Sequence, residues 1–269
     1  EHGQFAVIFN DVTRLKNIEA ELTTRQKELE TANLDLVDKN SELERFNYTV
    51  SHDLKSPLIT IKGFLGMLQQ DLDRDDAKAV AKDIKFVCDA ADTMEGLLDD
   101  ILELSRIGRT NHQTEVLSMT EVANEALKLV QGQVRERDVL VDVQPDMPAF
   151  PVDRRRMTEV YQNLLDNAIK FMGEQKQPKI EVGCKSRDGR QVLYVKDNGC
   201  GIDARYLDKI FGLFDQLDQR IPGTGIGLAL VTRVIETHGG TVWAESPGED
   251  AGATLYFTLN STEENTNVG

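Results

Sequence analysis

The sequence predicts a multidomain chain in which an all-α region is followed by a mixed α/β domain. Two observations predict the all-α region. Apolar residues recur at helical spacing from Leu15 to Ile101, and a short acidic segment, D-L-D-R-D-D at 71–76, interrupts them. The second domain is predicted because, from Glu115 on, short apolar strands alternate with helical segments. A length of 269 residues is enough for about two domains.

The composition is that of a folded chain with charged helices, since 40% of the residues are hydrophobic and 29% are charged. A net charge of −15 argues against a nucleic-acid partner and favours basic or transient protein partners. No apolar run reaches the length of about 18 residues that a membrane segment needs, so we expect none in this chain. The first residue is Glu rather than Met, so the chain can be a fragment or a processed product, and an upstream membrane segment is not excluded. Three cysteines without metal-ligand spacing indicate a reducing compartment, and we expect a cytoplasmic location.

Residues 2–14, H-G-Q-F-A-V-I-F-N-D-V-T-R, read as a strand that ends in an Asp-Val-Thr turn. Thirteen residues are too few to form a domain. The segment resembles the last strand and exit motif of a PAS sensor domain, which implies an upstream sensor domain in the same protein. The alternative interpretation is a disordered chain end.

A heptad pattern then predicts a parallel coiled coil over residues 15–45. Its first seam repeats every seven residues without a miss: Leu15, Leu22, Leu29, Leu36, Leu43 and Val50. The second seam is less apolar: Ile18, Arg25, Ala32, Lys39 and Phe46. These polar defects suit a helix that transmits a signal by a change of register, but a simple dimerisation stalk has the same pattern.

Residues 46–110 are predicted to form a helical hairpin with a linker at its end. Its first helix carries the stripe Val50, Leu54, Leu58, Ile61, Leu65, Leu68 and Leu72. Its second helix carries the stripe Val80, Ile84, Val87, Ala91, Met94, Leu98 and Ile101. One hairpin cannot cover both stripes, whereas two hairpins packed as a four-helix bundle can. We therefore expect a homodimer.

His52 lies between two residues of the first stripe, Val50 and Leu54, and is predicted to point away from the core into solvent. Lys55 and Ser56 share its face of the helix. An exposed histidine alone is ordinarily a solvated side chain. The surrounding segment S-H-D-L-K-S-P-L, however, resembles the phospho-acceptor motif of sensor histidine kinases.

The α/β domain is predicted to span residues 111–260, followed by a disordered polar tail at 261–269. Helices are expected near 119–134, 154–171 and 228–238. Strands are expected near 139–143, 179–185, 191–197, 241–245 and 253–259, with a Pro-rich loop at 145–151.

Within this domain, the segment N-L-L-D-N-A-I-K-F places four side chains on one side of a helix: Asn163, Asn167, Lys170 and Phe171. Amide oxygens beside a lysine fit a magnesium–triphosphate group. Taken alone, two such asparagines are more often an ordinary polar face.

Two glycine-rich segments follow. In D-N-G-C-G, residues 197–201, Asp197 at a strand end can accept a hydrogen bond from the amine of adenine, and Gly199 and Gly201 would let backbone approach the ring or ribose. In G-T-G-I-G-L, residues 223–228, backbone N–H groups at a helix start can hold phosphate. The second segment is neither a Walker loop nor a dinucleotide fingerprint. Each glycine segment alone is a weak signal.

In this order, the four segments resemble the acceptor box, Asn box and two glycine boxes of sensor histidine kinases of two-component systems. The segment I-F-G-L-F, residues 210–214, resembles the phenylalanine box between the glycine boxes. The resemblance covers about residues 40–260 and implies a HisKA-type dimerisation and phosphotransfer domain. It implies next an α/β sandwich ATP-binding domain of the GHKL type, shared with DNA gyrase and heat-shock chaperones.

The resemblance also implies ATP and Mg²⁺ as cofactors, with residues 203–224 as a mobile lid. It puts Asn163 and Asn167 near Mg²⁺, Lys170 near phosphate, Phe171 beside adenine and Asp197 on the adenine amine. The remaining nucleotide contacts that it implies are Gly199, Gly201, Gly223, Thr224, Gly225, Gly227 and Leu228.

Two departures from the family pattern matter. An arginine often follows the second Phe of the phenylalanine box, but here that segment is F-D-Q-L-D, so Lys209 or Arg220 is the candidate for the phosphate contact. Ser56 stands where family members that dephosphorylate their partner often have Thr or Asn. A hydroxyl can still orient water, so phosphatase activity toward the regulator stays open.

The predicted reaction is transfer of the γ-phosphoryl group of ATP to His52, with Asp53 holding the ring or taking its proton, and then to an aspartate of a response regulator receiver domain. One alternative is a conformational ATPase, but Asn163 stands where gyrase-type enzymes carry a water-activating glutamate. The other alternative is a dimeric adaptor that binds ATP without turnover.

Overall fold

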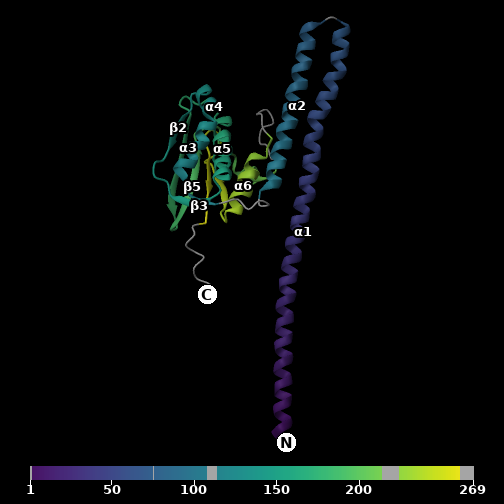
Figure 1. Cartoon of the computed structure of the whole chain (residues 1–269), viewed down its shortest axis with the longest axis vertical. Coiled ribbons are helices and arrows are strands. Elements are labelled where there is room, and N and C mark those ends of the chain that lie inside the picture. Colours follow the sequence, from purple (N-terminus) through teal and green to yellow (C-terminus); the bar gives the residue numbers. More distant parts are fainter. Residues whose placement is uncertain (1, 75, 108–113, 214–223, 261–269) are drawn as a thin grey trace. The chain divides into compact units, whose positions relative to one another are not determined.

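The computed structural model describes residues 2–74, 76–107, 114–213 and 224–260. The chain falls into two compact units, Glu1–Ser56 and Pro57–Gly269, which are described separately. Figure 1 shows the elements of both units.

The first unit is helical throughout its described length, as part of the helix α1, His2–Asp73. The strand predicted over residues 2–14 is therefore wrong. A short apolar run fits a strand and a helix equally well by pattern, and here a long helical segment follows directly, so helix propagation decides the outcome. The resemblance to the end of a PAS domain stays a prediction.

The coiled-coil seam cannot be recognised from exposure in a single chain. Leu22 and Leu29 are 61% and 72% exposed, but every other described side chain between residues 16 and 44 is exposed as well. A lone helix has no neighbour that could bury one face. The parallel pairing of two such helices therefore remains a prediction from the heptads.

In the second unit, the end of α1 and the helix α2, Ala77–Arg106, form a helical hairpin. The predicted break at 71–76 is confirmed, and Asp76 caps α2 by accepting hydrogen bonds from the N–H groups of Lys78 and Ala79. The rings of Phe64 and Phe86 stack between the two helices, with centroids 4.4 Å apart.

The inner face of α2 differs by one residue from the predicted stripe. The buried residues of this helix are Asp83, Ala90 and Leu97, whereas Ile84 and Leu98 of the stripe are 48% and 46% exposed. The apolar surface of α2 is thus wider than one neighbouring helix covers. This pattern is typical of a bundle helix that contacts more than one partner.

The rest of the second unit is an α/β domain built on a five-stranded sheet with the order β2-β4-β5-β7-β6. The strands are β2 Leu140–Val143, β4 Lys179–Arg187, β5 Arg190–Asp197, β6 Val242–Glu245 and β7 Thr254–Phe257. Only the β2–β4 pair is parallel among these described strands. A separate two-stranded sheet pairs β1 Glu115–Ser118 with β3 Ala149–Val152.

The helices of this domain are α3 Met119–Leu129, α4 Gln131–Glu136, α5 Arg154–Lys170 and α6 Gly227–Thr237. Two short 3-10 turns lie at Ala204–Tyr206 and Lys209–Phe211. The single helix predicted near 119–134 is in fact two, because the backbone of Val130 departs from helical geometry, with φ −95° and ψ 6°. The strand β3 also lies inside the predicted Pro-rich loop. Pro151 is tolerated there because an edge strand does not need every N–H.

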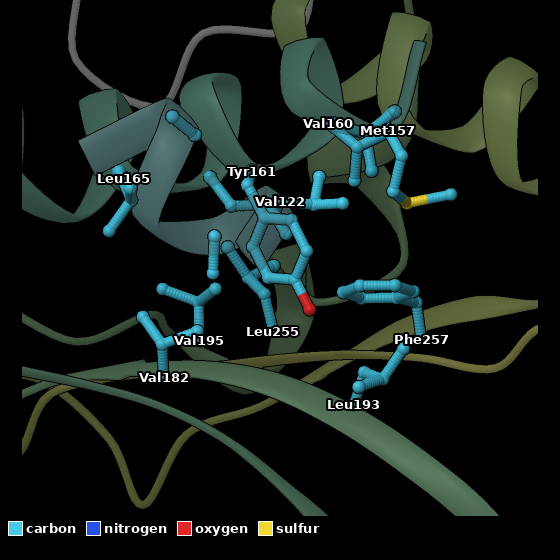
Figure 2. Close-up of a cluster of buried hydrophobic side chains, with 14 of the residues drawn as sticks. Val122, Met157, Val160, Tyr161, Leu165, Val182, Leu193, Val195, Leu255 and Phe257 are labelled. Carbon is cyan, nitrogen blue, oxygen red and sulfur yellow. The ribbon is translucent and has the colours of Figure 1, made fainter. Parts of the chain in front are cut away.

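The core lies between the helices and the large sheet (Figure 2). Tyr161 of α5 meets Phe257 of β7 edge to face, with ring centroids 5.6 Å apart. Around this pair, Val122 and Val160 from the helices face Leu193 from the sheet, and all of these residues are buried. This two-layer packing is the predicted α/β sandwich, which is confirmed.

Candidate functional site

The first candidate site is on α1 at His52, whose side chain is 69% exposed. Its Nδ1 atom lies 2.8 Å from Oδ1 of Asp53. An ionised carboxylate only accepts hydrogen bonds, so Nδ1 carries the proton and the lone pair is on Nε2. Adjacent residues do not face each other on an ideal helix, but these two side chains lie close enough to meet. Ser56, one turn later, is exposed.

The second candidate site is built on α5. Asp153 caps this helix by accepting a hydrogen bond from the N–H of Arg156 at 3.1 Å. One face of the helix carries the buried residues Met157, Val160, Tyr161, Leu164, Leu165 and Ala168. The four predicted site residues of this segment are all half-buried: Asn163, Asn167, Lys170 and Phe171. The amphipathic pattern therefore presents them together beside the core rather than within it.

Asn163 meets the start of α6. Its Nδ2 donates to the carbonyl of Glu159 at 2.9 Å, which leaves Oδ1 as an acceptor. A Cβ atom at Gly227 would lie 2.6 Å from this oxygen, so any larger residue there would displace the Asn163 side chain. The structure thus brings the Asn helix and the second glycine segment together, as predicted from the sequence.

The start of α6 can bind an anion. The helix begins at Gly227, so the first N–H groups of its N-terminal turn have no intrahelical acceptor. Gly225, just before it, adopts a positive φ of 71°. Leu228 is half-buried in the first turn. Such a turn is suited to phosphate oxygens.

Asp197 ends β5 and is tied to the backbone around it. Its Oδ1 accepts from the N–H groups of Gly199 at 2.8 Å and Ala253 at 3.2 Å. Burial raises the pKa of its carboxyl, although these N–H donors act in the opposite direction. The second carboxylate oxygen is left to accept from a ligand.

Gly199 and Gly201 are both closely packed against the chain's own backbone. A Cβ atom at Gly199 would collide with the carbonyl oxygen of Phe171, and one at Gly201 would collide with that of Gly248. Gly201 also has a φ of +70°. These contacts alone require glycine at both positions, and the predicted nucleotide contacts of both stay a prediction.

A contact that was not predicted links α2 to the second glycine segment within the second unit. The hydroxyl of Thr224 donates to Oδ2 of Asp100 at 2.5 Å. Burial raises the pKa of the Asp100 carboxyl, while the hydrogen bond from Thr224 and the charge of Lys170 lower it.

A second unpredicted contact lies one turn further along α2. Nη1 of Arg156 lies 2.9 Å from Glu103 and 2.7 Å from Glu159. Burial, and then the neighbouring Glu159, raise the pKa of Glu103. The spacing of Asp100 and Glu103 puts both acids on one helix face, but it does not reveal their distant partners.

The remaining predicted contacts are in or near the lid segment. Lys209 is exposed at the start of a 3-10 turn, and its Nζ lies 5.8 Å from the ring centroid of Tyr206. Arg220 and Gly223 lie outside the described residues. The phosphate contact predicted for Lys209 or Arg220 therefore stays a prediction.

None of the helices in the described ranges is long and apolar enough to cross a membrane. No group of three or more His, Cys, Asp or Glu side chains in these ranges is arranged to hold a metal ion. A magnesium ion would have to be bound by other ligands, such as amide oxygens and phosphates.

Comparison with known families decides between the possible interpretations of these two sites. Residues 42–110 match the His Kinase A (phospho-acceptor) domain. Residues 152–263 match the histidine kinase-, DNA gyrase B-, and HSP90-like ATPase family. The chain belongs to the sensor histidine kinases. His52 lies within the phospho-acceptor match, and the segments from Asn163 to Leu228 lie within the ATPase match.

Individual relatives are similar over most of this chain. The methanogenesis regulatory histidine kinase FilI of Methanothrix harundinacea is 43% identical over 240 residues, which are 89% of this chain and 27% of FilI. The phytochrome-like protein Cph1 of Synechocystis is 36% identical over 255 residues, which are 91% of this chain and 33% of Cph1. The chain thus spans about a third or less of these relatives.

Solved structures of histidine kinases share the fold. ThkA, in a crystal structure with the response regulator protein TrrA, has a TM-score of 0.64 at 23% identity and covers 84% of this chain and 64% of its own. AdeS of Acinetobacter baumannii has a TM-score of 0.56 at 21% identity, covering 78% of this chain and 98% of its own. At this level of identity, the similarity establishes the fold alone.

Proposed function

We propose that this histidine kinase core transfers the γ-phosphoryl group of ATP to His52 and then to an aspartate of a response regulator receiver domain. One observation carries the proposal: His52 is exposed, and its Nδ1 is held by Asp53 at 2.8 Å. This contact leaves the lone pair of Nε2 directed away from Asp53 and available to attack phosphorus.

The nucleotide site is proposed on the α/β domain. The amide oxygens of Asn163 and Asn167 would hold Mg²⁺, and the Asn163 oxygen beside Gly227 is a suitable ligand because its amide nitrogen is already bonded to Glu159. Mg²⁺ would supply charge neutralisation on the phosphates. Lys170 would bind phosphate. Backbone N–H groups of the second glycine segment would bind it too: Gly223, Thr224, Gly225, Gly227 and Leu228.

Adenine is proposed to lie between Phe171 and Asp197. The Asp197 oxygen that does not accept from Gly199 and Ala253 would accept a hydrogen bond from the exocyclic amine. Guanine carries a carbonyl at that position, so a carboxylate would repel it. This pairing would make the site selective for adenine nucleotides.

In the first step, Nε2 of His52 forms a bond to the γ-phosphorus while the bond from that phosphorus to the β–γ bridging oxygen breaks, which releases ADP. Asp53 stabilises the positive charge that develops on the ring through its hydrogen bond to Nδ1. In the second step, a carboxylate oxygen of the regulator bonds to phosphorus and the bond to Nε2 breaks.

The setting of this reaction is also proposed. The uncovered apolar surface of α2 and the heptads of α1 support a homodimer. The crystal structure of ThkA with the response regulator TrrA supports a regulator as partner. A cytoplasmic location and an upstream sensor domain, of the PAS type, complete the proposal. Ser56 lies exposed one turn after His52, so hydrolysis of the phosphorylated regulator is a second candidate activity.

Incubation with γ-labelled ATP tests the proposed function. Acid-labile label should appear on the wild-type protein and be absent from His52→Gln, because the N–P bond hydrolyses in acid. Free phosphate without labelled protein would indicate a conformational ATPase instead. Nucleotide binding with neither product would indicate an adaptor.

A further inference from the structure

The C-terminal end of α5 carries three of the proposed nucleotide contacts: Asn167, Lys170 and Phe171. The last carbonyl groups of any helix lack intrahelical partners, so this end frays unless something else binds them. Lys170 is the last residue of α5, and Phe171 follows it as the C-cap. The position of these side chains therefore depends on how the helix end is held.

Arg137 holds this end from one side. It follows α4, and its Nη1 donates to the carbonyl oxygens of Ile169 at 2.8 Å and Lys170 at 3.2 Å. A cation at the C-terminus of a helix is also favoured by the helix dipole. One guanidinium thus satisfies two carbonyls at the base of the proposed phosphate and adenine contacts.

Cys200 holds the same end from another side. Its backbone N–H and its thiol both donate to the carbonyl oxygen of Phe171, at 2.9 Å and 2.8 Å. Cys200 belongs to the loop that follows Asp197, and the neighbouring Gly199 allows the close approach. The helix end is therefore fixed on this side to the same loop that carries the proposed adenine acceptor.

We infer that Arg137 is a positioning residue of the nucleotide site, and this inference rests on the proposed function. Without its guanidinium, the carbonyl of Lys170 loses this donor and that of Ile169 keeps only backbone donors, among them the N–H of Met172 at 3.4 Å, so the last turn of α5 loosens. Lys170 and Phe171 then no longer stand ready for phosphate and adenine, so binding must first order them. Arg137 has this effect through the helix end and without touching the nucleotide.

The test uses the full chain with three variants. Arg137→Gln removes the charge, and Arg137→Lys keeps a cation that can reach a carbonyl. Arg135→Gln, at an exposed arginine of α4 two residues earlier, is the matched control. The dissociation constants of Mg-ATP and of ADP are measured by titration calorimetry. The thermal midpoint of the nucleotide-free protein is measured in parallel, and titrations are run well below it.

We expect Arg137→Gln to raise the dissociation constants of Mg-ATP and ADP about tenfold. Arg137→Lys should recover most of the lost affinity, and Arg135→Gln should bind both nucleotides as the wild type does. If Arg137→Gln lowers the thermal midpoint but binds both nucleotides within twofold of the wild type, Arg137 is only structural and the inference is wrong. A wild-type chain that binds no nucleotide would instead refute the proposed function, and this inference with it.

Discussion

At the scale of single residues, the contact between His52 and Asp53 defines the proposed chemistry. Because a carboxylate only accepts hydrogen bonds, the 2.8 Å contact assigns the ring proton to Nδ1, and the carboxylate would face the charge that forms during transfer. Both side chains are exposed enough for a substrate to reach the ring. We therefore propose that the acid contributes to the chemical step rather than to folding.

Asp53→Asn tests this role. We expect the rate of histidine phosphorylation to fall about a hundredfold, because a neutral amide stabilises the charged ring poorly. The affinity for ATP, measured by calorimetry, should not change. Asp92→Asn, an exposed acid on α2, is the control and should leave the rate unaltered. An unchanged rate in Asp53→Asn would contradict the assignment.

Asp197 offers a test in which stability and binding change in opposite directions. Burial raises the pKa of its carboxyl in the folded chain above the ordinary value of 3.8. The folded state therefore binds the proton more tightly than the unfolded state, and this residue's contribution to stability falls as the pH rises from 3.8 through the raised pKa.

Asp197→Asn should consequently be at least as stable as the wild type at neutral pH, since the amide oxygen can still accept from Gly199 and Ala253. It should bind ATP at least about tenfold more weakly, because the amide NH₂ group would face the adenine amine. Thermal midpoints between about pH 4 and pH 7 and calorimetry check both parts. Tight ATP binding by this variant would rule out the proposed adenine contact.

At the scale of elements, the junction of α5 with α6 depends on one missing Cβ atom. Gly227→Ala would place a methyl group 2.6 Å from the Asn163 oxygen and should push α6 away from α5. We expect ATP affinity to fall more than about tenfold and labelling of His52 to be lost. Gly132→Ala on α4 is the control, because a Cβ there meets no atom within 4 Å. Equal ATP affinity of both variants would refute the proposed phosphate site at the start of α6.

The helix α2 places a carboxylate beside the proposed phosphate site. Asp100 accepts a hydrogen bond from Thr224 at 2.5 Å; burial raises the pKa of its carboxyl, and the charge of Lys170 acts to lower it. Phosphate groups that bind there would be repelled by this charge. Asp100→Asn should therefore bind Mg-ATP about fivefold more tightly, roughly 1 kcal/mol, in calorimetry. The neighbouring Asp99→Asn, which is exposed, should bind as the wild type does, and weaker binding by Asp100→Asn would contradict the argument.

At the scale of the whole molecule, the sequence predicted features that depend on neighbouring residues but missed contacts between residues that are distant in sequence. The Asn helix and the exposed position of His52 were predicted because each lies within a few turns of chain. The apolar stripe of the first helix was predicted only in part, since Leu58, Leu65 and Leu72 are 45%, 50% and 59% exposed. Residues 2–14 were misread as a strand, since a short apolar run does not distinguish the two periods. Arg137, Asp100 and Cys200 escaped prediction because their partners are distant in sequence. Nothing near these residues signals the contacts.

The dimer can be tested with two leucines that look alike in the single chain. Leu36 and Leu34 are both 67% exposed, but Leu36 is on the heptad seam and Leu34 is on the opposite side of the helix. Leu36→Ser should weaken dimerisation about thirtyfold, roughly 2 kcal/mol, whereas Leu34→Ser should have little effect. Sedimentation equilibrium measures both. Equal effects would argue against the predicted seam.

The helix α1 runs from His2 to Asp73 and includes Pro57 within it. Every residue inserted between His2 and His52 turns the beginning of this helix about 100° relative to His52, while seven inserted residues restore the original orientation to within about 20°. Any unit joined to its beginning is thus held in angular phase with His52. The number of residues between that unit and His52 therefore sets their relative orientation, and this orientation repeats with each heptad.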